Sequence, residues 1–379
     1  MKKSALALAV AAALVGFGTV ARADTTLYGS ARVSLDYTDT DSDYARAANG
    51  DLVRTAVGSA AWDMFNNASR LGVRGEEELG GGLSAIYQYE FGVDITEGGN
   101  LTSNRPKFVG LKGGFGQISV GTQETPYYHI VGIADTFNSG RTFGPGAWLG
   151  GAFALDAVGE LSNVRGPGDL VRSVDSLYYA TPDVAGFGAE AMLVMDGVAT
   201  NSDPFSKSVD IWNVALKYSN GPFFAGLSYI KINGDSNIDL GKNDFGQNVV
   251  ANFDLDQWAL GLGYNSGPFG VAFIYERGDV NANGLGRKLK FDGLSVSSDE
   301  PQSWYLTGSY SFGNNTLRAA YGQLDGGIDG FDKVENYLVG YQYNFSKRTS
   351  VWLEYIGRNG DELFFGDQNA ISIGTRVDF

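Results

Sequence analysis

Apolar and polar side chains alternate along most of the chain after residue 24. Over 337–345, every second side chain is aromatic or aliphatic, and those between are mostly polar or Gly. Successive side chains of a strand point to opposite faces, so this pattern predicts a two-faced strand. The alternation predicts sixteen strands, over residues 25–37, 69–78, 83–92, 105–112, 116–123, 172–180, 187–195, 209–218, 223–230, 257–264, 269–276, 303–312, 316–322, 336–345, 349–356 and 370–379.

Two-faced strands fit either a soluble β-sandwich or a membrane barrel, and the position of the aromatic side chains separates the two. Trp and Tyr fall at the ends of the predicted strands, as at Trp212 and Tyr218 or Trp258 and Tyr264. Smaller aliphatic residues and Gly occupy the middle. Aromatic girdles around an apolar band are typical of a bilayer-spanning barrel, whereas a sandwich core places large aromatics in mid-strand.

The connections between the predicted strands alternate in length. Seven are tight turns containing Gly, Asn or Pro, and eight are longer polar stretches, including residues 38–68 and 124–171. This alternation is typical of a barrel with periplasmic turns at one rim and outer loops at the other. The last strand stops at Phe379, so we expect it to close the barrel against 25–37. The predicted fold is all-β, a transmembrane antiparallel β-barrel of sixteen strands.

The N-terminus has the layout of a secretory signal peptide. Lys2 and Lys3 precede an apolar stretch over 5–20, and small residues at Ala21 and Ala23 offer a cleavage site. We therefore predict a signal peptide over 1–23 and one barrel domain over 24–379. Removing the three basic residues of this segment takes the formal net charge from −15 to −18.

Composition excludes several functional classes. The chain has no Cys, which excludes disulfides, thiolate metal sites and a thiol nucleophile. Its sequence pI of about 4.5 argues against a nucleic-acid partner. The single histidine, His129, leaves little basis for a Ser–His catalytic pair. We predict neither an enzyme nor a cofactor.

Five segments resemble strands of the Gram-negative general porins. They are 26–32 (TLYGSAR), 69–77 (SRLGVRGEE), 108–112 (FVGLK), 116–121 (GQISVG) and 172–179 (RSVDSLYY). The terminal Phe379 is similar to the assembly signature of that family. The resemblance spans the predicted mature chain. It implies an outer-membrane homotrimer in contact with lipid and lipopolysaccharide, with a third loop folded into the lumen as a constriction.

The third long stretch, 124–171, is the longest and contains the apolar run 143–153 (FGPGAWLGGAF), which favours packing against an inner wall. The resemblance implies a basic wall facing acids on this loop. In the family pattern the basic residue of the first strand falls at Ser30, two positions before Arg32. The predicted basic residues are Arg32, Arg70, Arg74, Arg105 and Arg172, and the predicted acids are Asp135, Asp156 and Glu160.

The predicted function is a passive pore for ions and small hydrophilic solutes, and the acidic balance predicts that this pore prefers cations. A substrate-selective porin for an anion, a sugar or a dicarboxylate is the alternative. A sugar pore would carry a ladder of lumenal aromatics, and a phosphate pore would be rich in lumenal Lys. Loosely spaced carboxylates at Asp325, Asp329 and Asp332 could hold Ca²⁺ or Mg²⁺, although they do not match the twelve-residue calcium loop.

Overall fold

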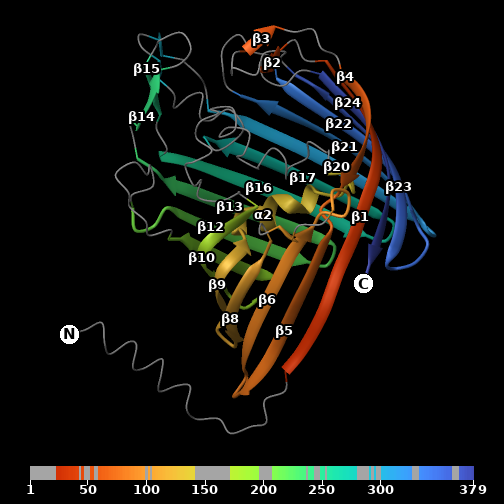
Figure 1. The fold of residues 1–379 in the computed structure, drawn as a ribbon. Coiled ribbons are helices and arrows are strands. Elements are labelled where there is room, and N and C mark those ends of the chain that lie inside the picture. Colours follow the sequence, from red (N-terminus) through yellow and green to blue (C-terminus); the bar gives the residue numbers. More distant parts are fainter. Residues whose placement is uncertain are drawn as a thin grey trace.

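Antiparallel strands build almost the whole described part of the chain, and they wrap into a barrel (Figure 1). The computed structural model describes residues 23–41, 44–46, 52–54, 59–98, 101–102, 105–140, 171–195, 207–235, 238–242, 248–251, 254–279, 290–291, 294–295, 300–326, 333–360 and 367–379. The predicted signal peptide lies outside these residues, except for its last residue, Ala23. Among the described residues, no helix has the length and apolar character needed to cross a membrane.

Eighteen strand segments form the barrel sheet. They are β1 (Ala23–Asp41), β4 (Ser59–Asn66), β5 (Arg70–Gly80), β6 (Leu83–Val93), β7 (Leu101–Thr102), β8 (Lys107–Gly113), β9 (Gly116–Glu124), β10 (Arg172–Ala180), β11 (Phe187–Val194), β12 (Ile211–Asn220), β13 (Phe223–Asn233), β16 (Asp254–Ser266), β17 (Phe269–Gly278), β20 (Gln302–Phe312), β21 (Asn315–Asp325), β22 (Val334–Asn344), β23 (Thr349–Asn359) and β24 (Asp367–Asp378).

These segments occupy sixteen positions around the barrel. β4 and β5 lie end to end along β1, and β7 and β8 lie end to end along β6. β1 pairs with β24 on its other side, so the sheet has no open edge there. The main chain of Phe379 completes this closure, because Gly29 N–H donates to Phe379 O at 3.0 Å and Phe379 N–H donates to Gly29 O at 3.1 Å. The predicted sixteen-stranded antiparallel barrel is confirmed.

The stretch 38–68, predicted as an outer loop, is partly strand. β1 continues to Asp41, and β4 returns along it in antiparallel register, with Tyr37 opposite Trp62. The period-two signal failed here because Ala60, Ala61 and Trp62 break the alternation.

Six short strands lie outside the barrel sheet. β2 (Tyr44–Arg46) pairs with β3 (Leu52–Arg54). A second small sheet contains β14 (Ile238–Lys242), β15 (Asn248–Ala251), β18 (Lys290–Phe291) and β19 (Leu294–Ser295). The labelled strands β2, β3, β14 and β15 lie beyond the same end of the barrel in Figure 1.

The two faces of the barrel strands differ in the sense that the sequence predicts. On β1, Ser34 and Asp36 are buried on the inner side, whereas Leu35 between them is 47% exposed on the outer side. Val339 and Ile373 on other strands are likewise exposed. A water-soluble protein rarely leaves so many large apolar side chains uncovered, but a bilayer accepts them.

Aromatic pairs on neighbouring strands form two rows near the strand ends. Beside the short turns, ring centroids of Phe223 and Tyr264 are 5.2 Å apart, and those of Phe269 and Tyr310 are 5.0 Å apart. At the opposite ends, Trp304 lies 5.4 Å from Tyr321. These rows agree with the predicted girdles at the two membrane interfaces.

The described beginning of the third loop enters the barrel. Pro126 starts the helix α2 (Pro126–Val131), and Thr125 caps it by accepting from Tyr128 N–H at 3.0 Å. The 3₁₀ helix η1 (Gly132–Ala134) follows. Tyr127 and Val131 are fully buried against inward-facing side chains of the wall. The segment 125–140 therefore lies on the lumenal side of the strands, as Figure 1 shows for α2.

Candidate functional site

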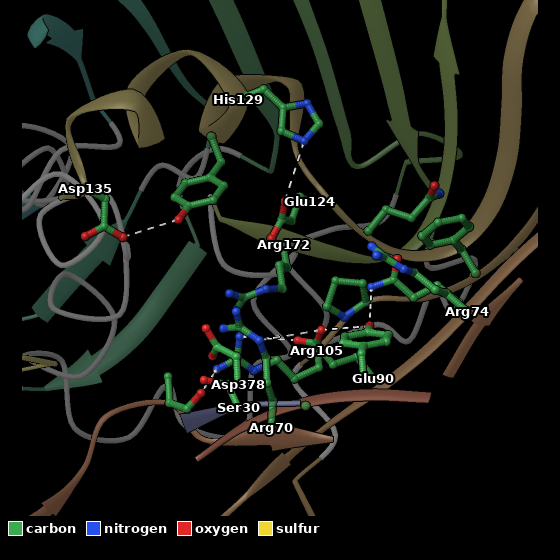
Figure 2. Close-up of a pocket in the computed structure, with 18 of the residues that line it drawn as sticks. Ser30, Arg70, Arg74, Glu90, Arg105, Glu124, His129, Asp135, Arg172 and Asp378 are labelled. Carbon is green, nitrogen blue, oxygen red and sulfur yellow. Dashed lines mark hydrogen bonds and ion pairs between the residues drawn. The ribbon is translucent and has the colours of Figure 1, made fainter. Parts of the chain in front are cut away.

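A cavity of about 860 Å³ lies inside the barrel beside the third-loop segment. Its lining comes from β1, β5, β6, β8, β9, β10 and β24 and from the connecting residues Ala68, Arg105 and Pro106. Tyr128, His129 and Asp135 of the third-loop segment and the terminal Phe379 complete it. Most of these side chains are polar or charged (Figure 2). The closed sheet therefore surrounds a charged space, which lies beside the apolar cluster under α2.

All five arginines that the sequence predicts for the basic wall line this cavity. Arg32 belongs to β1, Arg70 and Arg74 to β5, and Arg172 to β10, while Arg105 precedes β8. The strand residues reach the same space because alternate positions share the inner face. In the family pattern the basic residue of the first strand falls at Ser30. Arg32 Nε donates to Ser30 Oγ at 3.0 Å, so Arg32 lies in contact with that position.

Glu90 on β6 is central to this basic wall and was not among the predicted site residues. Its Oε1 lies 3.5 Å from Arg105 Nη1, and its Oε2 lies 3.9 Å from Arg70 Nε. Tyr28 OH donates to the same carboxylate at 2.9 Å, and Arg74 lies over the Tyr28 ring at 5.1 Å. Because Glu90 falls on the polar face of the predicted strand 83–92, alternation alone could have placed it.

A second charged pair extends the wall at the C-terminus. Arg376 Nε donates to both carboxylate oxygens of Asp378, at 2.9 and 2.8 Å, and both residues line the cavity. From the sequence, this strand was predicted only to close the barrel. Side chains alternate along β24, so Arg376 and Asp378 lie on the inner face, opposite Ile373 and Val377.

Among the predicted acids, Asp135 lines the cavity from the third-loop segment. Tyr128 OH donates to its Oδ2 at 3.5 Å. Burial raises the pKa of Asp135, and the Tyr128 hydrogen bond and the charge of Arg32 offset part of that increase. Asp156 and Glu160 lie outside the described residues, so the acidic side is placed only in part.

The candidate metal ligands are not brought together in the described part of the chain. Asp325 forms an ion pair with Lys333 at 3.3 Å, and Asp329 and Asp332 lie outside the described residues. No cluster of three His, Asp or Glu side chains suited to a metal occurs among the described residues.

The arrangement is suited to conduction. Fixed charges of both signs face one water-accessible space, where they produce a field across the path of a solute. A closed barrel with an apolar outer band, aromatic girdles and a charged lumen defines an outer-membrane channel protein.

The chain belongs to the Gram-negative porins, whose family model matches residues 7–361. It is 29% identical over 383 residues to the major outer membrane protein P.IB of Neisseria gonorrhoeae, covering 96% of each chain. It is 28% identical over 408 residues to an outer membrane porin of Bordetella pertussis, covering 100% of this chain and 99% of the relative.

Solved structures agree on the fold. An anion-selective porin from Comamonas acidovorans superposes with a TM-score of 0.69 at 21% identity, over 94% of this chain and all of that one. OmpF of Salmonella typhi, solved with daunomycin, gives a TM-score of 0.62 at 17% identity, over 94% of this chain and 97% of that one. The protein is thus a passive channel of the Gram-negative outer membrane and not an enzyme.

Proposed function

We propose that this porin passes ions and small hydrophilic solutes by diffusion, without a dedicated substrate. The observation that carries the proposal is the cavity of about 860 Å³, whose charged lining comes from both the wall and the third-loop segment. Among the described residues, the buried lumenal aromatics Tyr178, Tyr305 and Trp352 come from β10, β20 and β23, so these three side chains form no continuous ladder for sugars.

Liposome swelling tests this proposal. Chemically unrelated neutral solutes should enter protein-containing liposomes at rates that fall smoothly with molecular size. Single-channel conductance should rise in proportion to salt concentration. A conductance that saturates with one solute, or entry of only one class of solute, would instead support the substrate-selective alternative.

The total charge of the chain supports a preference of the pore for cations. The predicted mature charge of −18 favours cations, because an acidic protein attracts counter-ions to its entrances. Many of these acids lie in the stretches predicted as outer loops, including Asp39 and Asp235. Cation preference is therefore the proposal that the sequence supports.

The charges around the cavity support the opposite preference. Among the described residues, six arginines line it against four side-chain carboxylates: Arg32, Arg70, Arg74, Arg105, Arg172 and Arg376 against Glu90, Glu124, Asp135 and Asp378. Along β1, Asp39 is seven residues from Arg32, or roughly 23 Å at the rise of an extended strand. That separation exceeds the Debye length of about 8 Å at physiological salt, so outer acids are screened from an ion at the wall. An anion-preferring porin is the second candidate function.

A reversal potential measured across a planar bilayer under a KCl gradient separates these candidates. If the cavity wall dominates, the potential will have the sign of anion preference near physiological salt. If the outer acids dominate, it will show cation preference that weakens as salt is raised. The sign of the potential decides between them.

Neutralising two wall arginines should shift this selectivity toward cations. A unit charge about 4 Å away changes the energy of an ion by about 1 kcal/mol in bulk water. We therefore expect the Arg70→Gln/Arg105→Gln double variant to change the permeability ratio several-fold, measured as the reversal potential.

The matched control is the Arg277→Gln/Arg348→Gln double variant, which removes two exposed arginines outside the cavity lining. It should leave the reversal potential close to that of the wild type. Equal ion selectivity in both double variants would show that Arg70 and Arg105 do not contribute to the selectivity of the pore.

We also propose that the barrel works as a homotrimer in contact with outer-membrane lipid and lipopolysaccharide. Membership of the porin family supports this assembly. Native mass spectrometry of the detergent-extracted protein should give the mass of three mature chains. A monomer that conducts fully would contradict the proposal.

A further inference from the structure

The only histidine of the chain lies between two carboxylates at the edge of the cavity. His129 is on α2, and its Nδ1 lies 2.7 Å from Glu190 Oε2 on β11. Its Nε2 lies 3.7 Å from Glu124 Oε2 at the end of β9 (Figure 2). The imidazole therefore bridges the third-loop helix and two parts of the wall.

This geometry specifies the protonation state of the ring. An ionised carboxylate only accepts hydrogen bonds, and a neutral imidazole has one N–H donor and one acceptor nitrogen. A neutral His129 would turn a lone pair toward either Glu124 or Glu190. An imidazolium presents N–H groups to both carboxylates and adds favourable charge attraction.

The surrounding groups strengthen this arrangement. Glu190 is 5% exposed, and its other oxygen, Oε1, contacts Lys217 Nζ on β12, so the buried carboxylate lies between the imidazole and an ammonium group. The Tyr178 ring on β10 meets the imidazole edge-on, with centroids 6.3 Å apart. Burial lowers the pKa of His129, but hydrogen bonds and charge attraction from Glu124 and Glu190 outweigh burial and raise it to about 9.

We propose that His129 is held as an imidazolium by Glu124 and Glu190, that this bridge fixes α2 on the barrel wall, and that its charge adds to the basic side of the pore. The inference about conduction rests on the proposed function, whereas the inference about protonation and loop attachment does not. The cavity then carries a positive charge that the strand residues alone do not supply.

The sign of the pH dependence follows from linkage. The folded-state pKa of about 9 is above the ordinary value of 6.5, so the protonated ring favours the attached helix. This stabilisation is complete below about pH 6.5 and is lost as the pH rises through about 9. Because the ring stays mostly protonated until the pH approaches 9, the charge of the pore should change mainly in alkaline solution and little between pH 7 and pH 8.

Because the chain contains one histidine, NMR can follow its protonation without assignment. Tag-free protein with ¹⁵N-labelled histidine, folded in detergent, should give imidazolium-type shifts for both ring nitrogens at pH 7. The titration midpoint should lie near pH 9. A midpoint at or below about 6.5, the value of an unperturbed histidine, would overturn the proposal.

Two carboxamide variants separate the bridge from a general effect of charge. Glu190→Gln removes the carboxylate that contacts Nδ1 and should lower the histidine midpoint by more than one pH unit. Glu78→Gln removes an exposed carboxylate on β5 and should leave the midpoint unchanged. An equal midpoint in both variants would contradict the bridge.

Reversal potentials measured between pH 7 and pH 10.5 test the consequence for conduction. The wild type should shift toward cations as His129 loses its proton, and His129→Gln should already be shifted at pH 7 and vary less. A barrel that does not conduct would refute the proposed function while the NMR titration still decides the imidazolium. If the His129 titration midpoint is high but wild type and His129→Gln have the same ion selectivity, only the contribution of the His129 charge to selectivity is refuted.

Discussion

Replacing Gly261 with alanine should push α2 away from the barrel wall and lower the single-channel conductance. Gly261 on β16 pairs with Gly226 on β13 beneath the helix. A Cβ at Gly261 would lie 2.6 Å from the carbonyl oxygen of Ile130, a backbone atom that cannot move without the helix. Such overpacking costs about 1–3 kcal/mol, and displacement of α2 into the lumen would relieve it.

The strand itself supplies a matched control. Gly263→Ala, two residues along β16, places its Cβ 3.4 Å from Phe224 Cβ and 3.8 Å from Ile133 Cδ1, which are ordinary contacts. This variant should conduct like the wild type in planar bilayers. Equal conductance for Gly261→Ala and the wild type would show that α2 does not border the conducting path.

Replacing Glu354 with alanine should detach residues 138–139 from the wall and make the open-channel current noisier. Glu354 on β23 is 1% exposed. It accepts from Asn138 N–H at 2.9 Å, from Asn138 Nδ2 at 3.0 Å and from Ser139 N–H at 2.9 Å. Hydrogen bonds to a charged group contribute about 1.5–3 kcal/mol each, so we expect a loss of about 3 kcal/mol or more.

Urea unfolding followed by tryptophan fluorescence measures this loss, and single-channel noise measures the detachment. Glu78→Gln serves again as the control, because Glu78 is an exposed carboxylate on β5. Noise in Glu354→Ala no greater than in that control would contradict a role for Glu354 in holding the loop. Arg318 contributes a favourable charge near Glu354, so the alanine variant also leaves this half-buried cation less compensated.

Much of the fold follows from local alternation. The inner positions of β1 were predicted from the contrast between Ser34 and Leu35, and the structure buries one and exposes the other. The same rule places Arg70 and Arg74 on one face of β5. Period two is a property of the extended backbone, so it needs no knowledge of the partner strand.

Alternation does not show which inner charges lie together. Glu90 and Arg376 lie on inner faces that the sequence defined, but nothing local shows which inner charges gather at one height of the barrel. That height depends on strand register and stagger, which pair Ser30 with Asp378 and Ser30 with Arg70 on the two sides of β1. His129 lies on a short helix in the lumen, where period two has no meaning.

The sequence by itself determined the barrel class and the outward and inward faces of the strands, because each follows from side-chain alternation or short turns. The resemblance to the porins implied the arginines of the basic wall. Only the tertiary structure decided which charges face one another. Contacts such as His129 with Glu190 and Asn138 with Glu354 join residues 61 and 216 positions apart in the chain. They form because barrel closure and the inward third-loop segment bring distant inner faces within hydrogen-bonding distance.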